Sequence, residues 1–217
     1  MNLSSCTTLY KVFSTFILLL LLASCATKPP ITASLGYIQQ DLSTLTRWQV
    51  SGKIAFITPN ERASAYMNWQ NSEDQVAFNL NNLLGINLAN LEITNGNVVL
   101  EANSERFTGE SPSQLIYETT GWRVPIEELQ NWVKGYIPSN LNEINQPTIK
   151  YSENGLAESV NFDCEFCDVW NIRYVGFQTA NIGEQQYVLP KTIDMTNPAY
   201  QARIKINVSK WSQYIAR

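Results

Sequence analysis

Cysteine is the residue type in this chain that is best placed for covalent chemistry, and Cys25 is the clearest case. The 217-residue sequence begins with one positive charge, Lys11, followed by a mostly apolar run from Val12 to Leu22. This run ends in Leu22-Ala23-Ser24-Cys25, a branched apolar residue and two small residues before a cysteine. The pattern is the lipobox that lipoprotein signal peptidase cuts, and it predicts that Cys25 becomes a lipid-modified first residue. The plainer interpretation is an ordinary secretory signal with a chance cysteine.

The other cysteines leave one close pair. Cys6 lies within the predicted signal peptide, whereas Cys164 and Cys167 stand together as Cys-Glu-Phe-Cys. In an oxidising compartment this spacing favours a local disulfide that closes a tight turn. A redox-active pair is the alternative, but the surrounding pattern lacks the βαβ unit that usually carries such a motif.

The remaining residue types offer little for catalysis. The chain has no histidine, which excludes His-dependent nucleophiles and most zinc sites. Glu127 and Glu128 are adjacent, but neighbours on a helix do not face each other, so they cannot flank a bond as an acid–base pair. We therefore expect no enzyme activity, no metal and no cofactor. A net charge of −4 provides no electrostatic footprint for nucleic acid.

These N-terminal patterns divide the chain into three parts. Residues 1–24 are predicted to be a cleaved lipoprotein signal peptide, because their apolar run is shorter than the roughly 20 residues of a membrane-spanning helix. Residues 25–33 form a lipidated tether that includes Thr27-Lys28-Pro29-Pro30. Ala26 stands where an aspartate would favour retention at the inner membrane, so the outer membrane is expected. Residues 34–217 are long enough for one domain with its own core.

Apolar periodicity predicts the elements of this domain. Leu35, Ile38, Leu42 and Leu45 follow helical spacing and predict a helix before the first strand. Alternation with period 2 then predicts strands at 48–56, 65–70, 76–80, 86–88, 91–93, 98–100, 149–151, 160–162, 169–177, 187–189 and 204–209. The apolar phase slips by one residue after Leu88, which predicts a β-bulge.

Two short helices interrupt the strands. Ser111-Pro112 provides a capping residue and a proline at the first helical position, and Gly121 ends this helix. A second helix begins at Pro125 and ends before Gly135, with Glu127 and Glu128 in its first turn and Lys134 in its last. The order of elements predicts one α+β domain with an antiparallel sheet curled over helices. Such a sheet either packs as a solid core or lines a cavity, and its alternation is the same in both cases.

Several short motifs in this body resemble the LolB family. They are Trp48-x-Val50-x-Gly52-Lys53-Ile54-Ala55, Tyr66-x-x-Trp69-Gln70, Asn82-Leu83-Leu84-Gly85, Gly121-x-x-Val124-Pro125, Leu129-x-x-Trp132-x-x-Gly135, Leu189-Pro190, Ile204-x-Ile206 and Trp211. Their order and spacing cover nearly the whole body. Leu83 replaces the proline that is usual in the family, and Gly135-Tyr136-Ile137-Pro138 is one residue longer than the family pattern. The Cys164/Cys167 pair is not a family hallmark.

This resemblance implies both a fold and a function. The fold is an open, unclosed antiparallel β-barrel or half-barrel with a helical lid, enclosing an apolar cavity. The implied function is that of an outer-membrane lipoprotein receptor, lipid-anchored and facing the periplasm. It accepts lipoprotein cargo from a LolA-type periplasmic carrier, shields the acyl chains and inserts them into outer-membrane lipid. The protein is expected to act as a monomer.

The resemblance also assigns roles to residues. Leu84, with its neighbour Leu83, corresponds to an exposed loop that the family needs for insertion into the membrane; the alternative is that both leucines pack under their hairpin. Candidate residues for the acyl-chain cavity share inward phases on the strands and the second helix. They are Trp48, Val50, Ile54, Phe56, Met67, Trp69, Phe78, Leu80, Leu129 and Trp132. Ordinary core residues would show the same pattern.

Three other functions compete with this one. A lipid-anchored barrel could bind another apolar ligand, as lipocalins do, although two capped helices argue against an up-and-down barrel. An envelope glycosidase is disfavoured by the arrangement of Glu127 and Glu128. A purely structural lipoprotein fits the same sequence.

Overall fold

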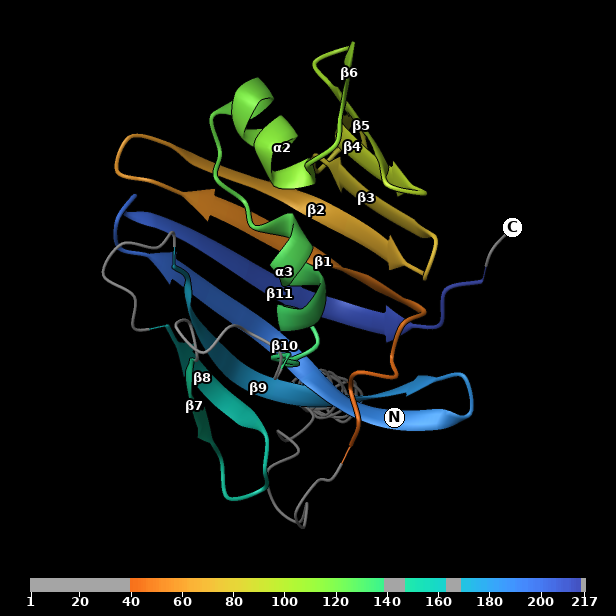
Figure 1. Ribbon diagram of the computed structural model, residues 1–217, viewed down its shortest axis with the longest axis vertical. Coiled ribbons are helices and arrows are strands. Elements are labelled where there is room, and N and C mark those ends of the chain that lie inside the picture. The colour runs from red at the N-terminus through yellow and green to blue at the C-terminus, as the bar shows by residue number, and fades with distance from the viewer. Residues whose placement is uncertain (1–39, 139–146, 163–168, 216–217) are drawn as a thin grey trace, which may run out of the picture. The chain divides into compact units, whose positions relative to one another are not determined.

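One open antiparallel sheet dominates the fold (Figure 1). The computed structural model describes residues 40–138, 147–162 and 169–215. The strands are β1 (Trp48–Ile57), β2 (Arg62–Asn71), β3 (Gln75–Asn81), β4 (Asn87–Thr94), β5 (Asn97–Ala102), β6 (Glu105–Gly109), β7 (Thr148–Tyr151), β8 (Ala157–Asn161), β9 (Asn171–Ile182), β10 (Gln185–Asn197) and β11 (Ala202–Ser212). Their order across the sheet is β6-β5-β4-β3-β2-β1-β11-β10-β9-β8-β7. Since β6 and β7 are edge strands, the barrel is unclosed, which confirms the predicted fold class.

Two helices lie on one face of this sheet, α2 (Pro112–Thr120) and α3 (Ile126–Trp132) (Figure 1). The Ser111 hydroxyl accepts a hydrogen bond from the Gln114 N–H, and Gly121 ends α2 in the left-handed conformation, as the capping rules predicted. The prediction that Lys134 lies in the last turn of the second helix is wrong. Helix α3 ends at Trp132, and Lys134 lies in the non-helical turn that follows. No helix in the described ranges is long and apolar enough to cross a bilayer.

The central strand β1 pairs with β2 on one side and with β11 on the other. Its alternate side chains Trp48, Val50 and Ile54 are fully buried, because strand side chains alternate between the two faces of a sheet. Trp48 packs edge-on against Trp69 of β2 and Trp211 of β11, with ring centroids 5.2 and 5.5 Å apart. The core is therefore centred between this part of the sheet and the helices.

The β-bulge predicted after Leu88 is confirmed. Leu80 of β3 pairs with Ala89 of β4, whereas the next residue, Asn81, pairs with Asn87, so Leu88 is the extra residue. A bulge of this kind bends its strand and redirects the side chain of the unpaired residue.

The prediction of a helix before the first strand is wrong for residues 40–47, the part of it that the structure describes. Residues 40–47, which we call the entry segment, contain a turn and no helix. The two leucines still pack against the core, so their apolar character reflects burial rather than helical periodicity. Residues 1–39, which include the predicted signal peptide, Cys25 and the whole predicted tether, lie outside the described residues, as does the Cys164/Cys167 pair.

Candidate functional site

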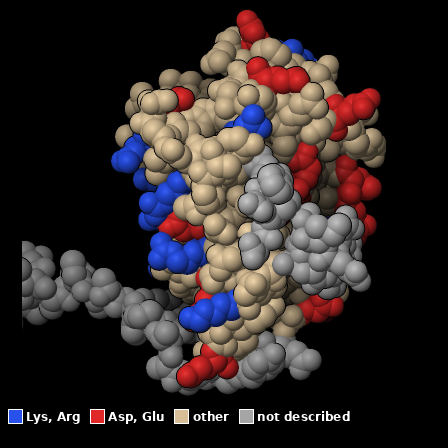
Figure 2. Space-filling view, turned by 60° about the vertical axis from the view of Figure 1, so that its left-hand side comes forward, with Lys and Arg blue, Asp and Glu red and all other residues tan. Residues whose placement is uncertain are grey.

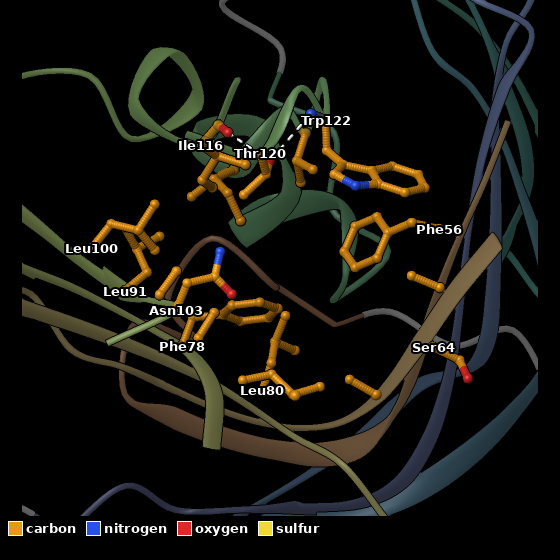
Figure 3. Close-up of a pocket in the computed structure, with 17 residues that line it drawn as sticks. Phe56, Ser64, Phe78, Leu80, Leu91, Leu100, Asn103, Ile116, Thr120 and Trp122 are labelled. Atoms are coloured by element: carbon orange, nitrogen blue, oxygen red, sulfur yellow. Dashed lines mark hydrogen bonds between the residues drawn. The ribbon is translucent and has the colours of Figure 1, made fainter. Parts of the chain in front are cut away.

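An apolar pocket of about 330 Å³ lies between the sheet and the segment that contains α2 (Figure 3). Its lining residues come from β1–β5, the turn after β5, α2, the segment that joins α2 to α3, and the start of α3. They are Phe56, Ala63, Ser64, Ala65, Phe78, Leu80, Leu88, Ala89, Leu91, Leu100, Ala102, Asn103, Ile116, Thr120, Trp122, Val124 and Ile126. None of them is charged, and only Ser64, Asn103 and Thr120 have polar side chains apart from the Trp122 indole. The pocket therefore suits an apolar ligand.

The wall on the helix side is held by local contacts. The Trp122 ring packs against Phe56 of β1 with centroids 5.3 Å apart. The Thr120 hydroxyl donates to the Ile116 carbonyl at 2.6 Å and accepts from the Trp122 N–H at 3.1 Å (Figure 3). These hydrogen bonds pair the Thr120 hydroxyl, the most polar group on this wall, so the wall presents mainly carbon to the pocket.

The structure separates the ten candidate cavity residues into two groups. Phe56, Phe78 and Leu80 line the pocket. The others are buried elsewhere in the core and do not line it: Trp48, Val50, Ile54, Met67, Trp69, Leu129 and Trp132. All ten face inward, but packing among Trp48, Trp69 and Trp211 fills the space over the middle of the sheet.

Sequence reasoning missed much of the lining. Trp122 and Ile116 come from the helical segment, whose contact with the sheet has no signature in local sequence. The role of Leu88 in the lining could have been predicted from the sequence. The phase slip at this position already indicated a bulge, and a bulge turns a side chain toward the other face of the sheet.

The β3–β4 turn, residues 82–86, projects two apolar side chains into solvent. Leu83 and Leu84 are 79% and 82% exposed. The Asn82 Oδ1 atom accepts hydrogen bonds from the backbone N–H groups of Leu84 and Ile86 at 2.9 and 3.0 Å, and Gly85 adopts a positive φ of 80°. The backbone of the turn is thus fixed, while its two leucine side chains are mostly exposed.

This turn and the pocket lie at the same end of the sheet. Tyr66 of β2 pairs with Asn81, the last residue of β3 before the turn. The pocket is lined at that end by Ala63, Leu80 and Ala89. The chain from Gln75 to Leu91 carries no charged residue, so this end offers an uncharged surface with exposed leucines beside an uncharged apolar pocket.

The outer face of the sheet, opposite the helices, has a different chemistry. Arg173, Arg203 and Lys205 lie there on β9 and β11, and the guanidinium groups of Arg173 and Arg203 bind the buried Asp194 carboxylate at 2.6–2.8 Å. Hydrogen bonds from Arg203 are the main cause of the lowered pKa of Asp194. Figure 2 shows Lys and Arg along one side of the molecule, away from most of the Asp and Glu side chains in that view.

Glu127, one of the two adjacent carboxylates considered above, makes structural hydrogen bonds. The Glu127 carboxylate accepts hydrogen bonds from the Ser111 hydroxyl and the Ser113 N–H, both at 3.2 Å, so it joins the beginning of α3 to that of α2. Among the residues that the structure describes, no three Asp, Glu, His or Cys side chains come together as a metal-binding group.

The fold and the site define the class of protein as an open antiparallel half-barrel with a pocket suited to an apolar ligand. Within this class, the chain belongs to the LolB family: residues 46–211 match the family described as outer membrane lipoprotein LolB. Relatives named outer-membrane lipoprotein LolB support this assignment. The protein from Aeromonas salmonicida is 30% identical over 208 residues, which cover 94% of this chain and 98% of that protein. The protein from Aeromonas hydrophila is 31% identical over 197 residues, with coverages of 89% and 92%.

A solved structure supports the fold alone. A DUF1329 family protein from Desulfovibrio piger aligns with a TM-score of 0.53 at 10% sequence identity, covering 82% of this chain and 90% of that one. The resemblance to the LolB family that the sequence motifs predicted is therefore confirmed by the family match and the relatives.

Proposed function

We propose that this protein accepts lipoproteins from a periplasmic LolA-type carrier, holds their acyl chains in the apolar pocket and releases them into the outer membrane. The observation that carries the proposal is the uncharged pocket beside the exposed turn with Leu83 and Leu84. Family membership supports the link to outer-membrane lipoproteins. No step of this transfer makes or breaks a covalent bond, so the protein acts without catalysis or cofactor.

The pocket provides the free energy for holding the cargo. Each CH₂ group that leaves water for an apolar environment contributes about 0.8 kcal/mol. A volume of about 330 Å³ is at the lower end of the range for small-molecule pockets, so it fits part of one acyl chain as it stands. Partial cover of the acyl chain favours a transient complex. This suits the proposed role, because the protein must bind the lipoprotein more tightly than the carrier does and less tightly than the bilayer does.

The β3–β4 turn provides the contact with the membrane. Leu84 points away from the body, and its transfer into an apolar environment is favourable by about 1.5–3 kcal/mol. No charged residue between Gln75 and Leu91 has to lose its hydration when the turn enters the membrane interface.

Lipid on Cys25 keeps the protein at the site of delivery in this proposal. The acyl groups on Cys25 anchor a monomer to the inner leaflet of the outer membrane, because several chains together give the stable attachment that a single chain does not. In this proposal Cys164 and Cys167 form a structural disulfide and take no part in transfer.

The test follows a labelled lipoprotein. The full chain, reconstituted in vesicles, is mixed with a LolA-type carrier loaded with a fluorescent lipoprotein, and the label is followed from carrier to chain to bilayer without nucleotide. We expect delivery that vesicles lacking the chain do not show. If the label stays on the carrier although the chain is folded, the proposal is contradicted, and a lipocalin-like role with another apolar ligand takes its place.

A further inference from the structure

A graded series of apolar side chains leads from the β3–β4 turn toward the pocket. The exposed fraction falls from 82% at Leu84 to 59% at Ile86 and 43% at Leu88. Phe78, deeper in the pocket lining, is only 6% exposed. Ile86 and Leu88 are two residues apart, the spacing that places side chains of an extended chain on one side.

The β-bulge explains why Leu88 belongs to the pocket at all. In a regular ladder, neighbouring residues point to opposite faces, yet Leu88 and Ala89 both line the pocket. Leu88 has no pairing partner on β3, since Leu80 pairs with Ala89 and Asn81 with Asn87. The extra residue therefore turns its side chain to the pocket at the end nearest the turn.

Leu88 also marks the rim of the pocket. A second, polar depression of about 310 Å³ shares Leu88, Ala102 and Asn103 with the apolar pocket. Its other walls include Glu101 and Arg106, which form an ion pair with a distance of 2.8 Å. A hydrocarbon chain that left the pocket on this side would meet charged groups, whereas the residues from Ile86 to Leu88 carry no charge and include two partly exposed apolar side chains.

We infer that Leu88 is a positioning residue for release, and that acyl chains pass from the pocket over Leu88 and Ile86 to the membrane at Leu84. This inference rests on the proposed function and adds the route and the residue at its threshold. The physical reason is that an acyl chain remains partly covered by carbon at each step, so no step exposes its full length to water. The substrate class is the diacylglyceryl group of a lipidated cysteine.

The experiment separates loading from release. A synthetic triacylated cysteine peptide with a dansyl label is delivered from cyclodextrin to the full chain in vesicles. Energy transfer from tryptophan, including Trp122 in the pocket wall, reports loading. Energy transfer from dansyl to a labelled lipid reports entry into the bilayer. We compare Leu88→Asn with Val175→Asn, because Val175 is a 47% exposed strand residue on the outer face, far along the sheet from the turn.

For Leu88→Asn we expect release, measured per loaded protein, to be about tenfold slower than in the wild type. Loading is measured separately, because Leu88 also lines the pocket and its replacement is expected to weaken loading. Val175→Asn should release at the wild-type rate, and Leu88→Met should restore most of the rate because it keeps an apolar side chain at the rim. Equal release rates for Leu88→Asn and Val175→Asn, with a wild type that loads and releases, overturn this inference and leave the proposed function standing. A folded wild type that does not load at all contradicts both.

Discussion

At the scale of single residues, Leu84 and Asp194 illustrate opposite uses of a side chain. Leu84 is exposed on a turn whose backbone is fixed by Asn82, so its contribution to folding is small and it is free to meet another surface. Asp194 is buried on the outer face and held by Arg173 and Arg203, so its role is within the fold.

Replacing Leu84 should therefore separate delivery from folding. We expect Leu84→Glu to leave the free energy of unfolding within about 0.5 kcal/mol of the wild type, because the residue is a surface position. Delivery of labelled lipoprotein to vesicles should be lost, because a carboxylate at the tip must be desolvated to enter the membrane. Urea unfolding and the transfer assay measure the two effects. Val175→Glu is the matched control, and loss of delivery in both variants would contradict a specific role for Leu84.

Asp194→Asn should destabilise the sheet in a pH-dependent way. At pH 7 we expect a loss of about 2 kcal/mol, since two guanidinium groups lose their hydrogen bonds to a carboxylate. The pKa of Asp194 is below its ordinary value of 3.8 in the folded protein. Its stabilisation is therefore complete above that value and is lost as the pH falls through the folded-state pKa.

Urea unfolding of the wild type and Asp194→Asn from pH 7 to pH 3 checks this prediction. The difference between the two proteins should shrink as the pH falls below about 4. Glu101→Gln removes an exposed ion pair with Arg106 and should change the free energy of unfolding by less than about 1 kcal/mol. A pH-independent difference for Asp194→Asn would mean that the carboxylate charge is not the stabilising feature.

At the scale of elements, β1 shows how one glycine determines a strand pairing. The register between β1 and β11 shifts between Ser51 and Gly52. A Cβ atom on Gly52 would lie 2.2 Å from the Asn207 carbonyl oxygen, which is backbone and cannot rotate away. Gly52 thus permits a close approach of β11 at the centre of the sheet.

Gly52→Ala is expected to lower the free energy of unfolding by about 3 kcal/mol, at the upper end of the usual cost of overpacking, because two central strands must move apart. Thermal or urea unfolding measures this loss. The control is Ser51→Ala on the same strand, which points to the outer face and should stay within about 0.5 kcal/mol. A Gly52→Ala variant as stable as Ser51→Ala would contradict the close approach.

At the scale of the whole molecule, the entry segment is tied to distant parts of the chain. The Lys134 ammonium donates hydrogen bonds to the carbonyl groups of Leu42 and Leu45 at 3.2 and 3.0 Å. The Gln40 side chain forms two hydrogen bonds with the backbone of Val188 in β10, and the Asn71 amide donates to the Thr46 carbonyl. These contacts hold the entry segment against the sheet and the residues that follow α3.

Lys134 makes the free energy of unfolding depend on pH in the alkaline range. Burial lowers the pKa of its amine from 10.5 to about 8. Between these values the unfolded chain binds the proton that the folded protein releases, so the contribution of Lys134 to the free energy of unfolding rises with pH.

Urea unfolding at pH 7.5, 8.5 and 9.5 tests this effect. The stability of the wild type relative to Lys134→Met should increase across the series, because methionine keeps the length of the side chain and has no proton to lose. A constant difference between the two proteins would show that the ammonium is not disfavoured by burial.

Local sequence patterns determined the elements and the family. The capping residues Ser111 and Gly121 predicted α2, period-2 alternation predicted most strands, and the phase slip at Leu88 predicted the bulge, since each depends on neighbours in the chain. Only the tertiary structure decided which inward side chains line the pocket. Phe56 and Trp48 lie on the same face of β1. Trp122 packs against Phe56 and leaves the pocket open beside it, whereas Trp69 and Trp211 fill the space beside Trp48. Alternation fixes the face of a side chain, but what packs against that face depends on residues far away in the sequence.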